Sequence, residues 1–89
     1  MYKLKLYITG QTPGSEKLLS DIKEMFDRNC GGKYSLEVYD IFEHPENAYD
    51  DMILATPTLI KILPEPVRKI VGDLSNRERV LAGLELDNF

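Results

Sequence analysis

Cysteine and histidine are almost absent from this sequence, since Cys30 and His44 are the only residues of their kinds. A lone cysteine excludes an intrachain disulfide, a CxxC redox pair and a cysteine-based zinc cluster. The lone histidine precedes a proline and has no second nitrogen or sulfur ligand to accompany it, so we interpret it as a loop residue rather than a metal ligand or an acid–base group. The cysteine count alone excludes several classes of enzyme.

Long hydrophobic runs and excess positive charge are also missing. No apolar run approaches the roughly 20 residues that span a bilayer, and the chain opens with a strand-like segment rather than a signal peptide. We therefore expect a cytoplasmic protein without a membrane partner. The formal net charge is -4, and binding nucleic-acid phosphates requires a surplus of lysine and arginine, so we expect no nucleic-acid partner.

What the sequence does contain is typical of one small globular domain. Of its 89 residues, 43% are hydrophobic and 29% are charged. We expect residues 1–89 to form a single domain. Because small domains bury a modest share of their surface, we also expect a thin margin of stability.

The first half of the chain predicts a strand and then a helix. Residues 2–8 alternate aliphatic with polar side chains, which is typical of a strand with one apolar face. Thr12 and Pro13 have the features of a helix N-cap and a first helical position. An apolar stripe at helical spacing follows. Its members are Leu18, Leu19, Ile22, Met25 and Phe26.

A second strand completes this unit. Gly31 and Gly32 can take the left-handed conformation that ends a helix. Alternation then resumes from Tyr34 to about Phe42. A connection of this length allows a right-handed crossover between two parallel strands.

After the break at His44-Pro45, the pattern predicts a short helix with its acidic side chains in solvent. The apolar residues assigned to it are Ala48, Tyr49, Met52 and Ile53, and the acidic ones are Glu46, Asp50 and Asp51. Together with Glu43, these carboxylates do not have the spacing or the glycine of an EF-hand loop, so we predict no calcium site there.

Two strands and a final helix account for the remainder. Residues 58–63 and 67–72 are largely apolar and flank a proline-bearing turn, which predicts an antiparallel pair. Ser75 and Glu78 have the spacing of a capping box that begins the last helix, which Gly83 is expected to weaken. The order βαβαββα predicts an α/β domain with a thioredoxin-like fold.

Three segments resemble the KaiB family, and because they lie between the first strand and the last helix, the resemblance extends over nearly the whole chain. The first is Leu4-Lys5-Leu6-Tyr7-Ile8-Thr9-Gly10-Gln11-Thr12-Pro13. The second is Ile53-Leu54-Ala55-Thr56-Pro57-Thr58-Leu59. The third is Leu63-Pro64-Glu65-Pro66-Val67-Arg68-Lys69-Ile70-Val71-Gly72-Asp73-Leu74-Ser75-Asn76-Arg77-Glu78.

The resemblance implies a non-enzymatic regulator with no cofactor and no catalytic or metal site. It implies binding to the hexameric ATPase KaiC, modulation of that partner's phosphorylation and timing cycle and, where KaiA is present, capture of KaiA. It also implies two folds: the thioredoxin-like form that binds KaiC, and a ground state, βαββααβ, in which the C-terminal half is rearranged. A homodimer or homotetramer is expected for the free protein.

Within this resemblance, several residues are candidates for the site. Thr56 and Pro57 match the threonine–proline position of thioredoxin-like proteins, where the peptide bond is cis, and Gly72 and Asp73 lie where the rearranged half changes course. The candidates for partner binding are the cations Lys5, Lys61, Arg68 and Lys69. With Lys3 they form either a basic patch on one side of the sheet or scattered solubilising charge, and the sequence leaves both interpretations open.

Two alternative functions are considered. One is the KaiB-like N-terminal sensor domain of a clock-output histidine kinase. The other is a thioredoxin-like oxidoreductase, which requires a reactive thiolate at the start of the first helix. The loop there contains no cysteine, and Cys30 is predicted at the far end of that helix, where the dipole disfavours a thiolate. We interpret Cys30 as a passive thiol and disfavour the oxidoreductase.

Overall fold

The computed structural model describes residues 1–84, except for the side chains of Asn29 and Cys30. Its elements are β1 (Tyr2–Ile8), α1 (Pro13–Cys30), β2 (Tyr34–Asp40), α2 (Pro45–Asp50), β3 (Thr58–Leu63), β4 (Arg68–Val71) and α3 (Arg77–Gly83). This order confirms the predicted βαβαββα arrangement. The predicted interpretation of the Cys30 thiol lies outside the described part of the chain.

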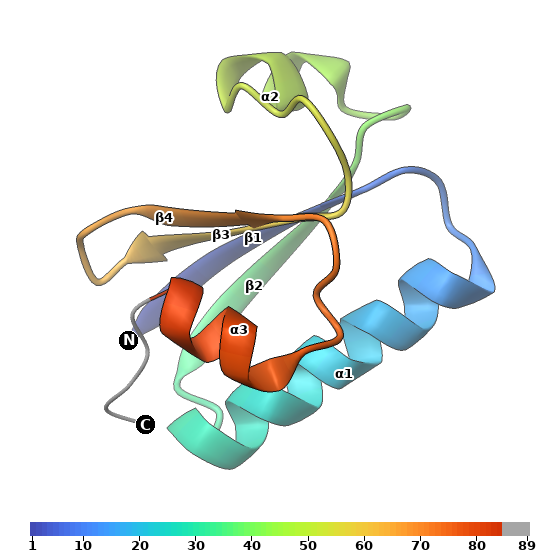
Figure 1. Ribbon diagram of the computed structural model, residues 1–89. Helices are drawn as coiled ribbons and strands as arrows, with labels where there is room; N and C mark the ends of the chain where they lie inside the picture. Colours follow the sequence, from blue (N-terminus) through green and yellow to red (C-terminus); the bar gives the residue numbers. More distant parts are fainter. Residues whose placement is uncertain (85–89) are drawn as a thin grey trace.

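The strands form one sheet in the order β2-β1-β3-β4. β1 pairs with β2 in parallel, while β1 with β3 and β3 with β4 are antiparallel. Figure 1 shows α1 and α3 on one side of this sheet and α2 on the other. We call the first side the helix face and the second the open face.

Local signals explain where α1 begins and ends. The side chain of Thr12 accepts a hydrogen bond from the backbone N–H of Ser15 (3.1 Å), as an N-cap residue should, and Pro13 follows it. At the other end, Gly31 has φ 60°, the left-handed conformation that a glycine adopts without a steric penalty. Both predicted boundaries are confirmed.

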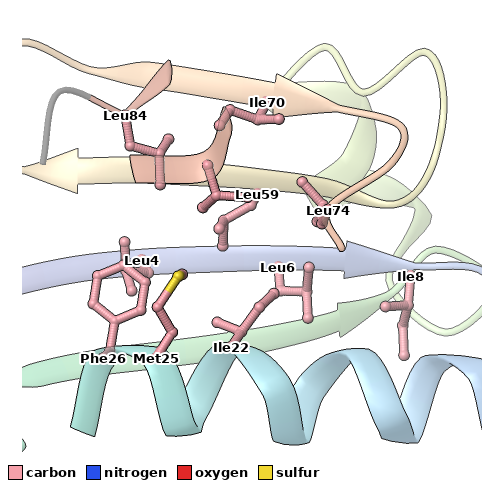
Figure 2. Close-up of a cluster of buried hydrophobic side chains, with 11 residues drawn as sticks. Leu4, Leu6, Ile8, Ile22, Met25, Phe26, Leu59, Ile70, Leu74 and Leu84 are labelled. Carbon is pink, nitrogen blue, oxygen red and sulfur yellow. The ribbon is translucent and has the colours of Figure 1, made fainter. Parts of the chain in front are cut away.

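The core lies between the helix face and α1. Side chains from β1, β3 and β4 meet those of the apolar stripe of α1, as Figure 2 shows. Leu4, Leu6, Phe26 and Leu59 are each fully buried. Burying one such side chain contributes about 1.5–3 kcal/mol, so this cluster holds α1 against the sheet.

Gly83, at the end of α3, has a packing role that the sequence did not reveal. A Cβ atom there would lie 2.7 Å from Cδ1 and 3.0 Å from Cγ1 of Ile70. With a larger residue at position 83, the Ile70 side chain or α3 itself would have to shift. The glycine predicted to weaken the helix therefore allows the helix to pack.

Several predicted boundaries are wrong by one or more residues, and two of them have a clear local cause. β2 ends at Asp40 rather than near Phe42, because the Asp40 carboxylate accepts hydrogen bonds from the N–H groups of Gly10 (3.1 Å) and Phe42 (2.9 Å) and turns the chain. The N-cap of α3 is Asn76 rather than Ser75, since its side chain accepts a hydrogen bond from the N–H of Arg79 (3.0 Å).

Candidate functional site

The open face carries most of the polar side chains that the strands direct away from the core. Strand register assigns them, because paired residues point to the same side and successive residues alternate. The polar residues of the open face are Lys3, Lys5 and Tyr7 of β1, Ser35, Glu37 and Tyr39 of β2, Thr58 of β3 and Lys69 of β4, and the apolar Ile60 and Val71 lie on the same face.

Three of these residues contact one aspartate that follows α2. Asp51 accepts a hydrogen bond from the Lys5 ammonium (3.2 Å) and another, a short one, from the Tyr7 hydroxyl. The Lys69 ammonium donates to the backbone carbonyl of Asp51. We call Lys5, Tyr7, Asp51 and Lys69 the open-face cluster. Its members come from β1, β4 and the segment after α2, so it joins three parts of the chain.

An aromatic group extends this cluster towards β2. The rings of Tyr7 and Tyr39 stack with their centroids 5.3 Å apart, and Lys5 lies over the Tyr39 ring at 5.7 Å. The Tyr39 hydroxyl donates to Glu37 (2.5 Å), and His44 packs edge-on against the same ring. The loop that leads into α2 is thus anchored to the same face.

The electrostatics of the cluster keep Asp51 ionised and Tyr7 neutral. Burial raises the pKa of the Asp51 carboxyl, but the hydrogen bonds from Tyr7 and Lys5 outweigh it, and the net pKa is lowered. Burial, followed by the hydrogen bond to Asp51, raises the pKa of the Tyr7 phenol. A neutral phenol and an ionised carboxylate form a charge-assisted hydrogen bond, the stronger kind.

The predicted orientation of the α2 region is confirmed for Glu46 and Asp50, which are exposed, but is wrong for three other residues. Asp51, expected in solvent, points into the open-face cluster, whereas Tyr49 and Met52 are 84% and 74% exposed. The cause is the chemistry of the open face, which carries cations and a phenol rather than apolar groups. An aspartate can accept the hydrogen bonds that these groups donate. Leu54 is 96% exposed as well, so three large apolar side chains point into solvent here.

Met52, two residues after the end of α2, has an unusual conformation. Its φ of 56° is left-handed, which few residues other than glycine adopt. The N–H of Met52 donates to the carbonyl of Tyr49 (3.0 Å), and that of Ile53 donates to the carbonyl of Ala48 (2.8 Å). These two bonds form a Schellman motif with methionine in the position usually occupied by glycine.

The four cations predicted to bind a partner do not form one patch. Lys5 and Lys69 lie on the open face, whereas Lys61 and Arg68 pair with each other on the helix face. Lys61 is only 2% exposed, so treating it as an exposed charge was wrong. Its place opposite Leu4 in the β1–β3 ladder explains why the sheet buries it. Arg68 and Lys69 are exposed.

The predicted switch residues lie close together at the end of β4. The peptide bond between Thr56 and Pro57 is cis, and the carbonyl of Pro57 accepts a hydrogen bond from the N–H of Gly72 (2.9 Å). Gly72 has φ 95°, a conformation that strains any residue with a side chain. One backbone hydrogen bond thus links the pair Thr56 and Pro57 to the pair Gly72 and Asp73.

Asp73 organises the turn that follows. Its carboxylate accepts hydrogen bonds from the N–H (2.9 Å) and the hydroxyl (2.6 Å) of Ser75, and these bonds lower the pKa of Asp73. Arg79 donates to the carbonyl oxygens of Val71 (3.1 Å) and Asp73. Ser75 therefore pairs with Asp73 rather than with Glu78, and the predicted capping box is wrong.

The start of α1 is where a thioredoxin would carry its reactive thiol. Here a shallow hollow is lined by Ile8, Thr12, Gly14, Ser15, Leu18 and Pro57. Its side chains offer hydroxyl groups, and the Thr12 hydroxyl is engaged in capping α1. Among the described residues, no three potential metal ligands gather in one place. None of the helices in the described part of the chain is long and apolar enough to cross a membrane.

Comparison with known families identifies the chain. A profile of the KaiB domain matches residues 5–86, which include the open-face cluster and the predicted switch residues. The chain belongs to the KaiB family. Two "Circadian clock oscillator protein KaiB" relatives, from Trichodesmium erythraeum (strain IMS101) and Nostoc sp. (strain PCC 7120 / SAG 25.82 / UTEX 2576), are 55% identical to it over 85 residues. The match covers 96% of this chain and 82% and 79% of the respective relatives.

Solved structures show the same fold at much lower identity. The N-terminal domain of SasA from Synechococcus elongatus matches with a TM-score of 0.77 at 21% identity, over 99% of this chain and 87% of that domain. Thioredoxin 1 from Thermosipho africanus TCF52B matches with a TM-score of 0.73 at 16% identity, over 96% and 92% of the two chains. This KaiB-family chain therefore has the predicted thioredoxin-like fold.

The sequence of this KaiB-family chain did not predict several residues of the site. Tyr7 had been counted among the polar side of its strand, and Tyr39 and Glu37 had been given no role. Asp51 had been assigned to solvent. The contacts of Tyr7 and Lys5 with Asp51 span 44 and 46 positions in the chain, and no local pattern reports such a distance. The only available signal was the run of lysine and tyrosine on the outer side of β1.

Proposed function

We propose that this chain is a non-enzymatic regulator that binds the hexameric ATPase KaiC and modulates its phosphorylation and timing cycle. The observation that supports this most strongly is the match of residues 5–86 to the KaiB domain, together with 55% identity to proteins named as circadian clock oscillators. Where KaiA is present, the bound form captures it. No cofactor takes part in this function.

The proposal includes a change of fold in the C-terminal half. In the thioredoxin-like form, residues 58–71 build β3 and β4, yet this stretch is apolar without a clean period, so its local preference is weak. Two folds can serve one function when their free energies differ by a few kcal/mol, because a partner's differential binding then shifts the population. The small size of the domain favours such a narrow difference.

The first experiment measures association of the 89-residue chain with KaiC hexamers in the presence of nucleotide. We expect a complex, formed slowly if the rearranged ground state dominates in the free protein. Fast association in a single phase would exclude the slow switch but keep KaiC as the partner. No complex under any nucleotide condition would contradict the proposal as a whole.

A second experiment tests the surface. Arg68 is exposed at the edge strand β4, and the charge reversal Arg68→Glu is expected to weaken the KaiC complex while changing the unfolding free energy by less than about 1 kcal/mol. The control is Lys33→Glu, an exposed cation beside the opposite edge strand β2. Equal affinity of both variants would remove Arg68 from the interface.

A second candidate function is a sensor domain of a clock-output histidine kinase. The observation that favours it is the fold similarity to the N-terminal domain of SasA. Such a domain keeps the thioredoxin-like fold permanently, so NMR chemical shifts of the isolated chain distinguish the two. A second set of shifts, and a mass corresponding to a dimer or tetramer, support the regulator. One set that is unchanged by KaiC supports the sensor domain.

A further inference from the structure

The α2 segment, which we define as residues 45–54, lies on the open face without an apolar core of its own. None of the residues of α2 is buried. The large apolar side chains Tyr49, Met52 and Leu54 point into solvent rather than towards the sheet. Burial of apolar surface, which holds α1 and the sheet together, therefore contributes little to holding this segment.

The segment is instead attached by hydrogen bonds from the sheet. Tyr7 lies within hydrogen-bonding distance of the Asn47 carbonyl (3.1 Å) and of the Asp51 carboxylate. Lys5 donates to the same carboxylate at 3.2 Å, and Lys69 donates to the Asp51 carbonyl. Three of these four contacts end on Asp51. Its side chain is 28% exposed, so these bonds are partly shielded from water.

The conformation at the end of the segment must also be stabilised by contacts with its surroundings. Met52 adopts a left-handed conformation that costs a residue with a side chain roughly 1 kcal/mol. Such a conformation persists where several surrounding contacts fix it in place. The Schellman bonds of Met52 and Ile53 supply part of that support, and the adjacent Asp51 supplies the link to the sheet.

We propose that Asp51 is a positioning residue that holds the α2 segment against the open face. By doing so it keeps the side chains of Tyr49, Met52 and Leu54 directed into solvent. The carboxylate does this by accepting hydrogen bonds from Lys5 and Tyr7 simultaneously. The proposal concerns how the segment is held, and it stands or falls independently of whether KaiC is the partner.

The test is native-state hydrogen exchange of the 89-residue chain, measured by NMR. The reporters are the amides of Asp51, Met52 and Ile53, whose acceptors are the carbonyl oxygens of Asn47, Tyr49 and Ala48 within the segment itself. Their exchange reports local opening of the segment. In the variant Asp51→Asn, loss of the charge-assisted bonds is expected to accelerate exchange of these amides about tenfold. Amides in the ladder between β1 and β2 should keep their wild-type rates.

The matched control is Asp50→Asn, which removes the same charge from the preceding, exposed position. Exchange of the three reporter amides should stay within about twofold of wild type in this variant. Equal acceleration in Asp50→Asn and Asp51→Asn would overturn the proposal, because it would assign the effect to net charge. Reporter amides that already exchange freely in the wild-type protein would also overturn it.

Tyr7→Phe provides a second route that keeps the aromatic ring and removes only the hydroxyl. We expect the same three amides to be accelerated, by less than in Asp51→Asn because Lys5 still pairs with the carboxylate. If Asp51→Asn fails to fold, this variant carries the test alone, and unchanged rates would contradict the proposal. Alkaline titration of the tyrosines adds a spectroscopic check: in Asp51→Asn one phenol should ionise at lower pH than in wild type.

Discussion

On the helix face, the sheet contacts α1 and α3 through aliphatic and aromatic side chains such as Leu6, Leu59 and Phe26. On the open face, Lys5, Tyr7 and Lys69 contact the α2 segment through hydrogen bonds. Apolar contact is non-directional and is spread over many residues, whereas the polar contacts converge on one aspartate. The two faces should therefore respond differently to single substitutions, to pH and to local strain.

The largest effect is expected on the helix face. Phe26→Ala removes a fully buried ring that packs against Tyr2 and Tyr34, and it should lower the free energy of unfolding by about 3–5 kcal/mol. Urea unfolding measures the loss. The control is Leu19→Ala on the same helix, which is partly exposed and should cost clearly less. Equal costs would show that burial does not set the stability of this face.

The close contact between α3 and β4 should give the next largest effect. Gly83→Ala improves helix propensity but places a Cβ 2.7 Å from Cδ1 of Ile70, so we expect a net cost of about 1–2 kcal/mol. Ile70→Val removes Cδ1. In the Ile70→Val background the loss of stability caused by Gly83→Ala should be smaller. Urea unfolding of wild type, the two single variants and the double variant completes this double-mutant cycle. An unchanged cost would show that the two side chains do not compete for space.

The open face should depend on pH through Asp51. In the folded protein Lys5 and Tyr7 of β1 and Lys69 of β4 face this group and lower its pKa. Its contribution is thus present above the unfolded pKa of about 4 and is lost as pH falls through the lower folded pKa. We expect the free energy of unfolding of wild type to exceed that of Asp51→Asn by about 1–2 kcal/mol at neutral pH, and by less near pH 3. Urea unfolding at both pH values checks this, and a constant difference would contradict it.

The smallest effect concerns strain at the end of the α2 segment. Met52→Gly relieves a left-handed φ of 56° while removing an exposed side chain, so it should stabilise the protein by about 0.5–1 kcal/mol. Asp50→Gly, a glycine inside the helix two positions earlier, should have the opposite sign. Thermal unfolding distinguishes them. A loss of stability in both variants would show that Met52 is not strained.

What the sequence predicted well rests on local signals. Thr12, Pro13 and Gly31 bound α1 because capping depends on residues a few positions apart. Alternation in residues 2–8 placed Leu4 and Leu6 in the core for the same reason. The order of elements, and with it the thioredoxin-like fold, followed from these local patterns.

What it predicted poorly depends on contacts between distant residues. Hydrophobicity predicts that Tyr49 points inward, and charge predicts that Asp51 points outward. The hydrogen-bonding partners on the open face reverse both orientations. The prediction of a basic surface requires Lys61 to be exposed, but its strand is paired on both sides and its side chain lies on the helix face. In each case the side chain's environment is set by a strand far away in the chain.

β1 is an inner strand of the sheet and pairs with strands from both halves of the chain. Its parallel ladder with β2 belongs to the continuous unit that ends at Asp40, whereas its antiparallel ladder with β3 joins that unit to the C-terminal half. The rearrangement that we propose for the C-terminal half would separate β1 from β3 and leave the β1–β2 ladder intact. The line of division runs through the middle of the sheet, so detaching the C-terminal half would leave one side of β1 available for new backbone pairing.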